Sequence, residues 1–270
     1  MLIDSHTHIG KIQFEVGKNR VKDLPGKDLI VSLDKFKIDF TIVSGIEGAE
    51  FYADSRLAPK KYQVSQKEGM GRMLNFVRNN NKVRALFWIK PYTELLTKEI
   101  EKMVADNRDL ICGLKVHPTL SNLKFTDKRF YPYLEMAVRL GLPVQVHTEN
   151  DGRSDIEFVG KMTSIFPELK FVMVHMGMDS DNSEAIALIK ETSNIYGDTC
   201  VVKHENVIKA IKECGADKIL FGTDAIVNGI DTYKQYIPLI EKIKETFSEQ
   251  EAAKVLGLNS MTIFNLPVSY

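Results

Sequence analysis

The chain has 270 residues, of which 44% are hydrophobic and 27% charged, a composition typical of a globular protein with a sizeable core. Lysine and arginine together number 36, aspartate and glutamate also number 36, and the formal net charge is therefore zero. A balanced charge exerts no long-range attraction on nucleic acids or anionic membranes, so we expect neither as a partner.

Eight short runs rich in β-branched residues are predicted to be strands. In chain order they cover residues 2–6, 39–44, 84–89, 111–116, 142–147, 169–175, 194–198 and 218–223. Apolar residues at three- and four-residue spacing predict helices between them, for example at 98–106, 130–140, 205–213 and 236–246. This alternation predicts an α/β fold with a parallel sheet, and eight strands favour a (β/α)₈ TIM barrel over an open, doubly wound sheet.

The segments between these elements predict one domain that spans residues 1–270. The sequence contains no internal repeat, low-complexity tract or Pro/Gly-rich linker. Its longest irregular stretches are residues 9–27 and 45–63, which follow the first two strands. They could form lids over the active-site end, although plain surface loops are the commoner case for most of these residues. After residue 248 we expect a short helix, then the segment GLNSMTIFNL, then an unstructured end.

The histidines are unevenly placed along this pattern. Five of the six lie at or just past the carboxyl end of a predicted strand, and the sixth, His204, begins a helix and is expected to be peripheral. Barrel enzymes build their active sites at that end, from residues that terminate different strands. The five strand-end histidines are therefore candidate functional residues: His6, His8, His117, His147 and His175.

Two of these histidines, His6 and His8, form an H-T-H triplet in the first strand. Alternate side chains of a strand share a face, so both imidazoles can reach one ion, and Asp4 on the same face could orient a ligand. Asp224 follows the last predicted strand. Neutral imidazoles with one carboxylate and an open position are typical of a catalytic zinc site.

With these residues in place, the sequence resembles the amidohydrolase superfamily. The resemblance is strongest to the branch that includes aminocarboxymuconate-semialdehyde decarboxylase and related hydrolases and lactonases. The ordered motifs span nearly the whole chain: DSHTHIG at 4–10, GLKVHP at 113–118, VQVHTE at 144–149, VMVHMG at 172–177, LFGTDA at 220–225 and GLNSMTIFNL at 257–266.

The resemblance implies a (β/α)₈ barrel with one divalent metal, usually zinc. It implies that the metal ligands are His6, His8, His147 and Asp224. It also implies that Asp224 takes the proton from a metal-activated water, and that His175 lies near this water as a second catalytic residue.

Three further residues have roles that the sequence leaves open. Lys115 is expected to be a carboxylated bridge in a binuclear site, an unmodified cation that binds substrate or a metal-site carboxylate, or a structural residue. His117 shares the strand face of Lys115 if the strand continues that far. Arg153 follows His147 on a loop and could bind a substrate carboxylate through both guanidinium nitrogens, although a solvated surface arginine is the commoner case.

The leading functional prediction is an enzyme that hydrolyses an amide, lactone or ester bond of a small organic molecule. The alternative is a metal-dependent, non-oxidative decarboxylase or hydratase of a small carboxylic acid at the same site. A deoxyribonuclease is disfavoured by the neutral charge and the lack of a basic stripe. A metal-binding barrel without activity is disfavoured because every ligand type and an apparent base are present.

The cellular setting follows from what the chain lacks. No run approaches the roughly 18 apolar residues of a membrane span, and no basic segment followed by an apolar one precedes the first strand. Cys112, Cys200 and Cys214 are odd in number and fit no metal-binding spacing, which favours a reducing compartment. We therefore expect a cytoplasmic protein; a homo-oligomer is compatible with the sequence and is not decided by it.

Overall fold

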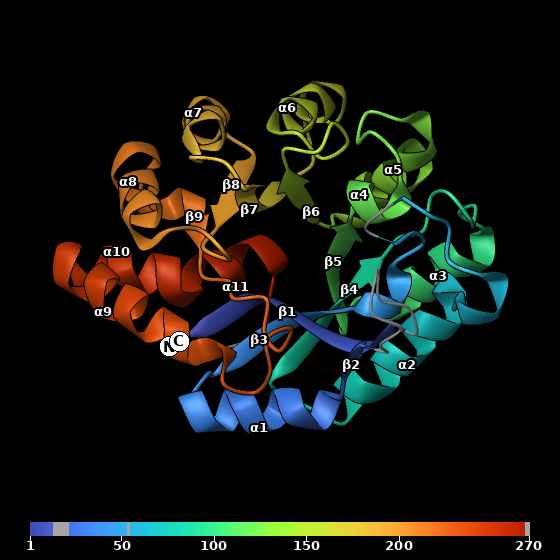
Figure 1. The fold of residues 1–270 in the computed structure, drawn as a ribbon, viewed down its shortest axis with the longest axis horizontal. Coiled ribbons are helices and arrows are strands. Elements are labelled where there is room, and N and C mark those ends of the chain that lie inside the picture. Colours follow the sequence, from blue (N-terminus) through green and yellow to red (C-terminus); the bar gives the residue numbers. More distant parts are fainter. Residues whose placement is uncertain (13–21, 53–54, 268–270) are drawn as a thin grey trace.

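Nine strands form one curled sheet in the computed structural model, which describes residues 1–12, 22–52 and 55–267 (Figure 1). The sheet order is β2-β1-β3-β4-β5-β6-β7-β8-β9. Eight strands run parallel: β1 (Ile3–Ile12), β3 (Phe40–Gly45), β4 (Val83–Trp88), β5 (Ile111–Val116), β6 (Val144–Glu149), β7 (Phe171–Met178), β8 (Ile195–Asp198) and β9 (Ile219–Leu220). Each of the eight predicted strands has a counterpart in the structure, although the bounds of the first and the last differ from the prediction.

Helices surround the outside of the curled sheet (Figure 1). Their bounds are α1 (Gly26–Phe36), α2 (Gln66–Arg78), α3 (Lys98–Asp106), α4 (Pro118–Ser121), α5 (Tyr131–Leu140), α6 (Ile156–Ile165), α7 (Ser183–Glu191), α8 (His204–Cys214), α9 (Ile237–Thr246), α10 (Glu249–Ala253) and α11 (Asn259–Phe264). Several begin at a side chain that accepts a backbone N–H, as Ser65 does for α2 and Thr97 for α3. None of the described helices is long and apolar enough to cross a membrane.

The buried apolar residues form two clusters, one on each face of the sheet. The larger cluster joins the strands to the surrounding helices. The smaller one contains Ile3, Phe40 and Val172 from the early parts of three strands, and it is covered by Ile263 and Phe264 of α11. Because α11 covers the amino-terminal end of the strands, the open end of the sheet is the carboxyl end.

The seam between the last and first parallel strands is irregular. The ladder of paired strands is open there, since β9 has only two residues and the predicted strand at 218–223 is wrong beyond Leu220. Phe221 donates its N–H to Val255 instead, and Asp224 has a left-handed backbone (φ 62°). Backbone hydrogen bonds still run from residues 221–225 to β1, including one from Asp224 N to His6 O (2.8 Å).

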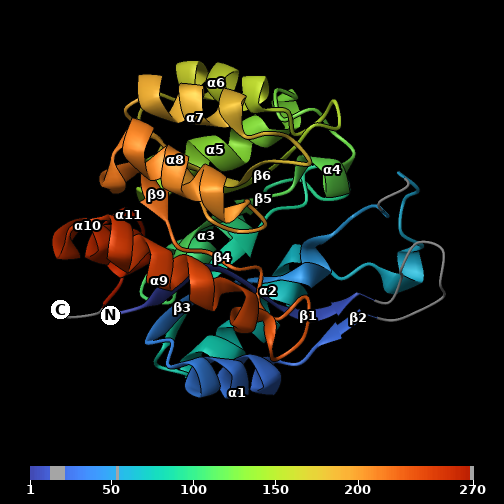
Figure 2. The ribbon, with the colours of Figure 1, turned by 60° about the vertical axis from the view of Figure 1, so that its left-hand side comes forward.

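The predicted irregular stretch 9–27 is wrong where it is described. β1 continues to Ile12 and pairs antiparallel with β2 (Lys22–Leu24), and α1 begins at Gly26. This hairpin extends past the ends of the other strands (Figure 2). The rest of that prediction, residues 13–21, lies outside the described residues.

Two other loop predictions have different outcomes. The stretch 45–63 holds only short 3₁₀ turns and an isolated bridge between Phe51 and Leu57, as expected for a long loop, and its residues 53–54 lie outside the described part. The tail is more ordered than expected, because a π-helical turn (Lys254–Leu258) joins α10 to α11. The predicted unstructured end falls on residues 268–270, which are also outside the described part.

We expect native protein to react slowly with a thiol reagent at a pH of about 8, close to the ordinary thiol pKa. Cys112, Cys200 and Cys214 are unpaired, and the first two are buried. Burial raises the pKa of Cys112 to about 12 and the pKa of Cys200 well above the ordinary thiol value. Cys214 is only half-buried, and its pKa is raised less strongly. Mass spectrometry should find Cys214 labelled first and all three thiols labelled after unfolding; rapid labelling of Cys112 in native protein would contradict this packing.

Candidate metal centre

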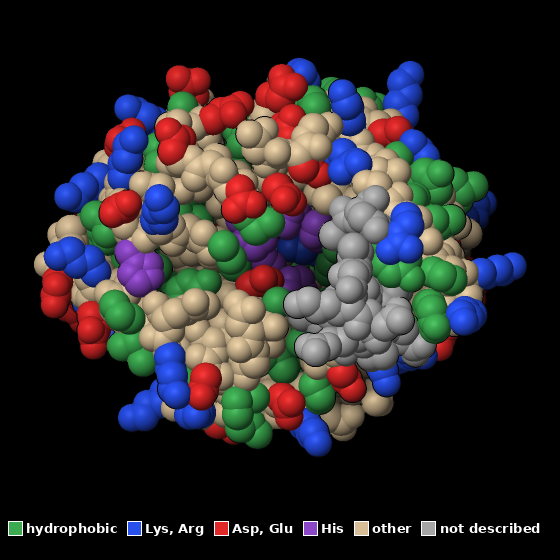
Figure 3. Space-filling model, in the orientation of Figure 1, with side chains coloured by type: hydrophobic (Ala, Val, Ile, Leu, Met, Phe, Trp, Pro, Cys, Tyr) green, Lys and Arg blue, Asp and Glu red, His purple; other side chains and the backbone are tan. Residues whose placement is uncertain are grey.

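Six aromatic side chains form a closed ring of contacts at the carboxyl ends of the strands. Neighbouring rings have centroids 3.8 to 5.9 Å apart. Figure 3 shows histidine side chains gathered in the central hollow of this face. In order around the ring the members are His6, His8, Trp88, His117, His147 and His175. The structure therefore brings together all five strand-end histidines, whereas His204 begins α8 away from them.

Three atoms that carry lone pairs converge beside β1. His6 Nε2 lies 3.0 Å from His8 Nε2, and Asp224 Oδ1 lies 3.0 Å from His8 Nε2 and 3.5 Å from His6 Nε2. Two lone-pair atoms about 3 Å apart repel each other unless a proton or a metal ion lies between them. These three atoms lie within 4.8 Å of one another, close enough to bind one metal ion.

The other ring nitrogens of these two histidines are held by neighbouring residues. His8 Nδ1 lies 2.9 Å from Ser44 Oγ and 3.3 Å from the Ser44 carbonyl oxygen, at the end of β3. His6 Nδ1 lies 3.0 Å from Asp198 Oδ2, at the end of β8. With Nδ1 engaged on both rings, Nε2 is the atom that each ring offers to an ion.

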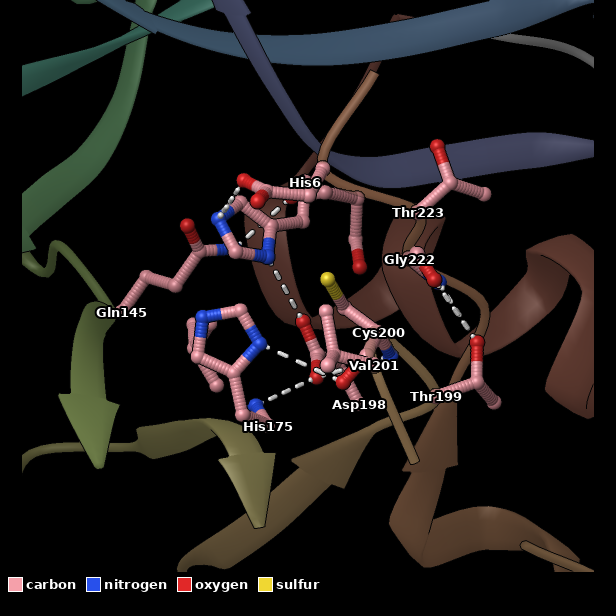
Figure 4. A network of polar contacts seen from close by, with 12 residues as sticks. His6, Gln145, His175, Asp198, Thr199, Cys200, Val201, Gly222 and Thr223 are labelled. Atoms are coloured by element: carbon pink, nitrogen blue, oxygen red, sulfur yellow. Dashed lines mark hydrogen bonds and ion pairs between the residues drawn. The ribbon is translucent and has the colours of Figure 1, made fainter. Parts of the chain in front are cut away.

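Asp198 is a site residue that the sequence prediction missed (Figure 4). It is fully buried, and its Oδ1 accepts backbone N–H groups from His175 (2.8 Å) and Cys200 (3.2 Å). Burial raises the pKa of its carboxyl to about 8, although these two donors and the Lys115 charge oppose the rise. Asp198 ends a predicted strand at the same rim as the histidines, which is the signal that could have identified it.

Lys115 on β5 reaches the same place from the opposite side. Its side chain is 1% exposed, with Nζ 3.2 Å from His6 Nε2 and 3.4 Å from Gln145 Oε1. Burial lowers the pKa of Lys115 to about 8, while Asp224 and Asp198 oppose the fall. An ammonium held here is a cation at the bottom of the hollow.

The remaining histidines are also oriented by specific partners. His147 Nε2 lies 3.2 Å from Glu149 Oε2, and His117 accepts the Leu120 N–H through Nδ1 (3.3 Å). His175 Nδ1 lies 3.2 Å from the carbonyl oxygen of Cys200. Burial lowers the pKa of both His147 and His175 to about 3, so these imidazoles are neutral near pH 7 and suited to bind a metal.

A second group with metal-ligating atoms consists of His6, His175 and the thiol of Cys200. It shares His6 with the first group, and His6 Nδ1 already faces Asp198 while His175 Nδ1 faces the Cys200 carbonyl. The close-up shows the Cys200 sulfur beside these rings (Figure 4). Because the two groups share His6, they belong to one hollow and do not form separate metal sites.

Both candidate catalytic residues have unusual backbones. His175 has φ 68° and Asp224 has φ 62°, a left-handed region that few non-glycine residues adopt and that recurs at active sites. Asp224 is 21% exposed at its side chain, so it can contact a ligand in the hollow. Burial alone would raise the pKa of Asp224, but the hydrogen bond and charge of His8, together with His6, lower it well below the ordinary value.

Two other sequence candidates face different partners. Asp4 is fully buried and accepts hydrogen bonds from the His6 N–H (3.0 Å) and the Tyr233 hydroxyl (2.7 Å), so it supports the backbone of β1. Arg153 donates to Ser55 Oγ (2.8 Å) and lies 3.4 Å from Asp151 Oδ2. Its guanidinium is thus engaged with its own loop and the loop after β3.

Comparisons with known proteins identify the family and the fold. The family model described as Amidohydrolase matches residues 67–266, more than half of the chain. Similar solved structures include an amidohydrolase from Burkholderia multivorans with bound zinc (12% identity, TM-score 0.72, 99% of this chain and 100% of that chain covered). A dihydroxybenzoic acid decarboxylase from a Polaromonas species, with bound manganese and an inhibitor, is 16% identical (TM-score 0.67, 99% and 98% covered). A probable 2-pyrone-4,6-dicarboxylic acid hydrolase from Acinetobacter baumannii is 15% identical (TM-score 0.66, 98% and 99% covered). No curated protein sequence matches the chain.

Proposed function

The chain belongs to the amidohydrolase family and is an enzyme, and from this premise we propose that it hydrolyses an amide, lactone or ester bond of a small organic molecule. The observation that carries the proposal is the convergence of His6 Nε2, His8 Nε2 and Asp224 Oδ1 in the hollow at the carboxyl ends of the strands. Two imidazoles and a carboxylate at that end are the donor set of a hydrolytic metal site.

We propose one zinc ion held by His6, His8, Asp224 and, as a further ligand, His147. The zinc-bound amidohydrolase and the manganese-bound decarboxylase support a divalent ion in this family of folds. Asp198 and Glu149 would orient His6 and His147 from behind, as carboxylates commonly do for metal-binding imidazoles. With Glu149 at Nε2 of His147, Nδ1 is the nitrogen left for the ion.

Each residue then has a defined part in hydrolysis. A bound metal would supply Lewis acidity and would lower the pKa of a water at the site. Asp224 would accept a proton from water as general base and donate it to the leaving group as general acid. The Lys115 ammonium stabilises negative charge that develops on the substrate oxygen, and His175 orients the substrate or the water.

We propose that Lys115 acts as an unmodified cation. Among the described residues, the metal-ligating groups include His6 in both cases, which favours one ion over two. A carboxylated Lys115 between two ions about 3.5–4 Å apart is the alternative. Elemental analysis and intact mass should give about one metal per chain and no added carboxyl group; two ions with a modified Lys115 would refute the mononuclear proposal.

We also propose that the sheet is a closed (β/α)₈ barrel and that residues 1–270 are one domain. The backbone hydrogen bonds from residues 221–225 to β1 support the closure, because they join the two ends of the parallel sheet. The three unpaired cysteines support a cytoplasmic location.

Decarboxylation of a small carboxylic acid is the second candidate, and Lys115 is the observation that favours it. A buried ammonium 3.2 Å from a proposed metal ligand can hold a substrate carboxylate beside the ion. Arg153 is less suited to that part, because Asp151 and Ser55 already engage its guanidinium.

One experiment separates the two reactions. Zinc- and manganese-loaded protein is incubated in labelled water with lactones, esters, N-acyl compounds and aromatic carboxylic acids. Hydrolysis places solvent oxygen in the product, whereas decarboxylation releases CO₂ and places a solvent hydrogen on carbon. Solvent oxygen in the product, lost on chelation, is the expected result; CO₂ release without it would replace hydrolysis by decarboxylation.

Gly222→Ala is expected to weaken metal binding about 10–100-fold, the usual effect of disturbing a partner of a metal ligand. An added methyl group would lie 2.9 Å from Asp198 Oδ2 and 3.0 Å from the His6 Cβ, so it would push these two residues apart. Gly71→Ala is the matched control, since its methyl group would meet no atom within 4 Å. Calorimetric metal titration of both variants tests this, and equal affinities would contradict the role of Asp198.

A further inference from the structure

A small cavity adjoins the histidine ring next to Trp88. It lies between the carboxyl ends of β3 and β4 and the first turns of α2, and it is lined in part by Glu47, Gln66, Trp88 and Lys90. Its volume is about 20 Å³, enough for a single water, which needs roughly 10–15 Å³ by this measure.

Two buried donors that line this cavity have at least one hydrogen without an acceptor. Trp88 Nε1 has no hydrogen-bond partner among the described residues, and Gln66 Nε2 has at most the Tyr133 hydroxyl, although Trp88 is only 7% exposed and Gln66 3%. Buried N–H groups are nearly always paired with protein or ordered water. The cavity has room for one water, and both Trp88 and Gln66 line it with an unpaired N–H. We therefore infer that the two N–H groups share one acceptor inside the cavity.

The orientation of the Gln66 amide is set by the backbone. Its Oε1 accepts the Lys90 N–H (3.1 Å), so a flipped amide would place two donors against each other. The amide also lies near Tyr133, where it opposes the rise that burial causes in the pKa of that phenol. The amide has two hydrogens, however, so contact with Tyr133 leaves one for the cavity.

The charges around the cavity are already paired. Lys90 Nζ lies 3.2 Å from Glu94 and donates to the Val64 carbonyl, and Arg72 lies 2.8 Å from Glu47. An anion would find no unpaired cation among the described residues that line the cavity, and it would face the Glu47 carboxylate. The acceptor is therefore neutral.

We propose that this cavity is a binding site for one buried water, which accepts hydrogen bonds from Trp88 Nε1 and Gln66 Nε2. The water holds the Trp88 indole in place on one side. Gly48 leaves room for the indole on another side, because a Cβ at residue 48 would lie 2.2 Å from the indole ring. The indole in turn stacks on His117 (5.7 Å, 14°) and lies 5.9 Å from His8. The water site stands whether or not the proposed reaction is correct.

A crystal structure grown with bromide in place of chloride tests the occupant. The expected result is electron density for one atom within hydrogen-bond distance of Trp88 Nε1 and Gln66 Nε2, without anomalous signal. Anomalous signal at that position would show a halide, and the absence of density would show that the donors have no shared ligand. Either result would overturn the proposal.

Trp88 is the only tryptophan in the sequence, so its indole N–H gives a single NMR signal in solution. We expect a cross-relaxation peak between this hydrogen and a long-lived water. Gln66→Glu keeps the oxygen that accepts the Lys90 N–H and replaces the amide nitrogen by a second carboxylate oxygen. A water can donate a hydrogen bond to this oxygen, whereas a halide would be repelled by its charge. The indole signal should shift in Gln66→Glu while its water peak persists.

Gln63→Glu is the matched control, because Gln63 donates to the Ala58 carbonyl (2.7 Å) outside this cavity. It should leave the indole signal in place. An unchanged indole signal in Gln66→Glu, or loss of the water peak on that change, would contradict a water shared with Gln66. The crystal experiment on the unaltered protein decides the question even if Gln66→Glu does not fold.

Discussion

Asp224→Asn is expected to retain bound metal and to lose turnover by about 10²–10⁴-fold, the usual effect of removing a general base. Asparagine can still offer its carbonyl oxygen to the ion, but it cannot accept a proton from water. The left-handed backbone at Asp224 (φ 62°) also suits asparagine better than most residues, so the variant should keep the native loop. Metal content and turnover on any compound from the substrate screen are the measurements.

Two further variants calibrate this result. Asp217→Asn alters an exposed carboxylate (71%) that pairs with Lys254. Asp217 lies just before β9 begins, at the opposite end of the strand from the site, so this variant should turn over at the native rate. His175→Asn should keep its metal and lose less activity than Asp224→Asn if it only orients the water or substrate. An Asp224→Asn protein that holds metal and works at the native rate would remove Asp224 as the base, and with it the proposed hydrolytic mechanism.

His6→Ala combined with His8→Ala is expected to abolish metal binding and leave a folded protein. The change removes two of the three converging donor atoms, and Asp224 alone cannot hold the ion. The stability of the fold comes instead from the two apolar clusters, which contain neither histidine. Elemental analysis, circular dichroism and thermal melting measure the two properties separately.

His204→Ala serves as the matched control, because His204 begins α8 outside the histidine ring. It should bind metal and melt as the unaltered protein does. If the double variant is unfolded at room temperature while His204→Ala is folded, the ion is structural, and a catalytic role for this centre is wrong.

The sequence by itself determined where the strands lie along the chain and that the histidines gather at one rim. Period-two and period-3.6 patterns are local signals, and a parallel sheet brings all strand ends of one direction to the same rim. His6, His147 and His175 could therefore be placed together from their positions at strand ends alone.

Only the tertiary structure decided which atoms face each other across the hollow. Asp198 lies 192 positions from His6, and its contact with His6 Nδ1 depends on how β1 and β8 curl toward one another. β9 is short because the backbone of the residues after Leu220 forms hydrogen bonds with distant Val255 and with β1. The β1–β2 hairpin likewise depends on a strand pairing for which the sequence carries no local signal. Trp88 and Gln66 came together because α2 packs against the end of β4, a long-range contact for which local hydrophobic periodicity carries no information.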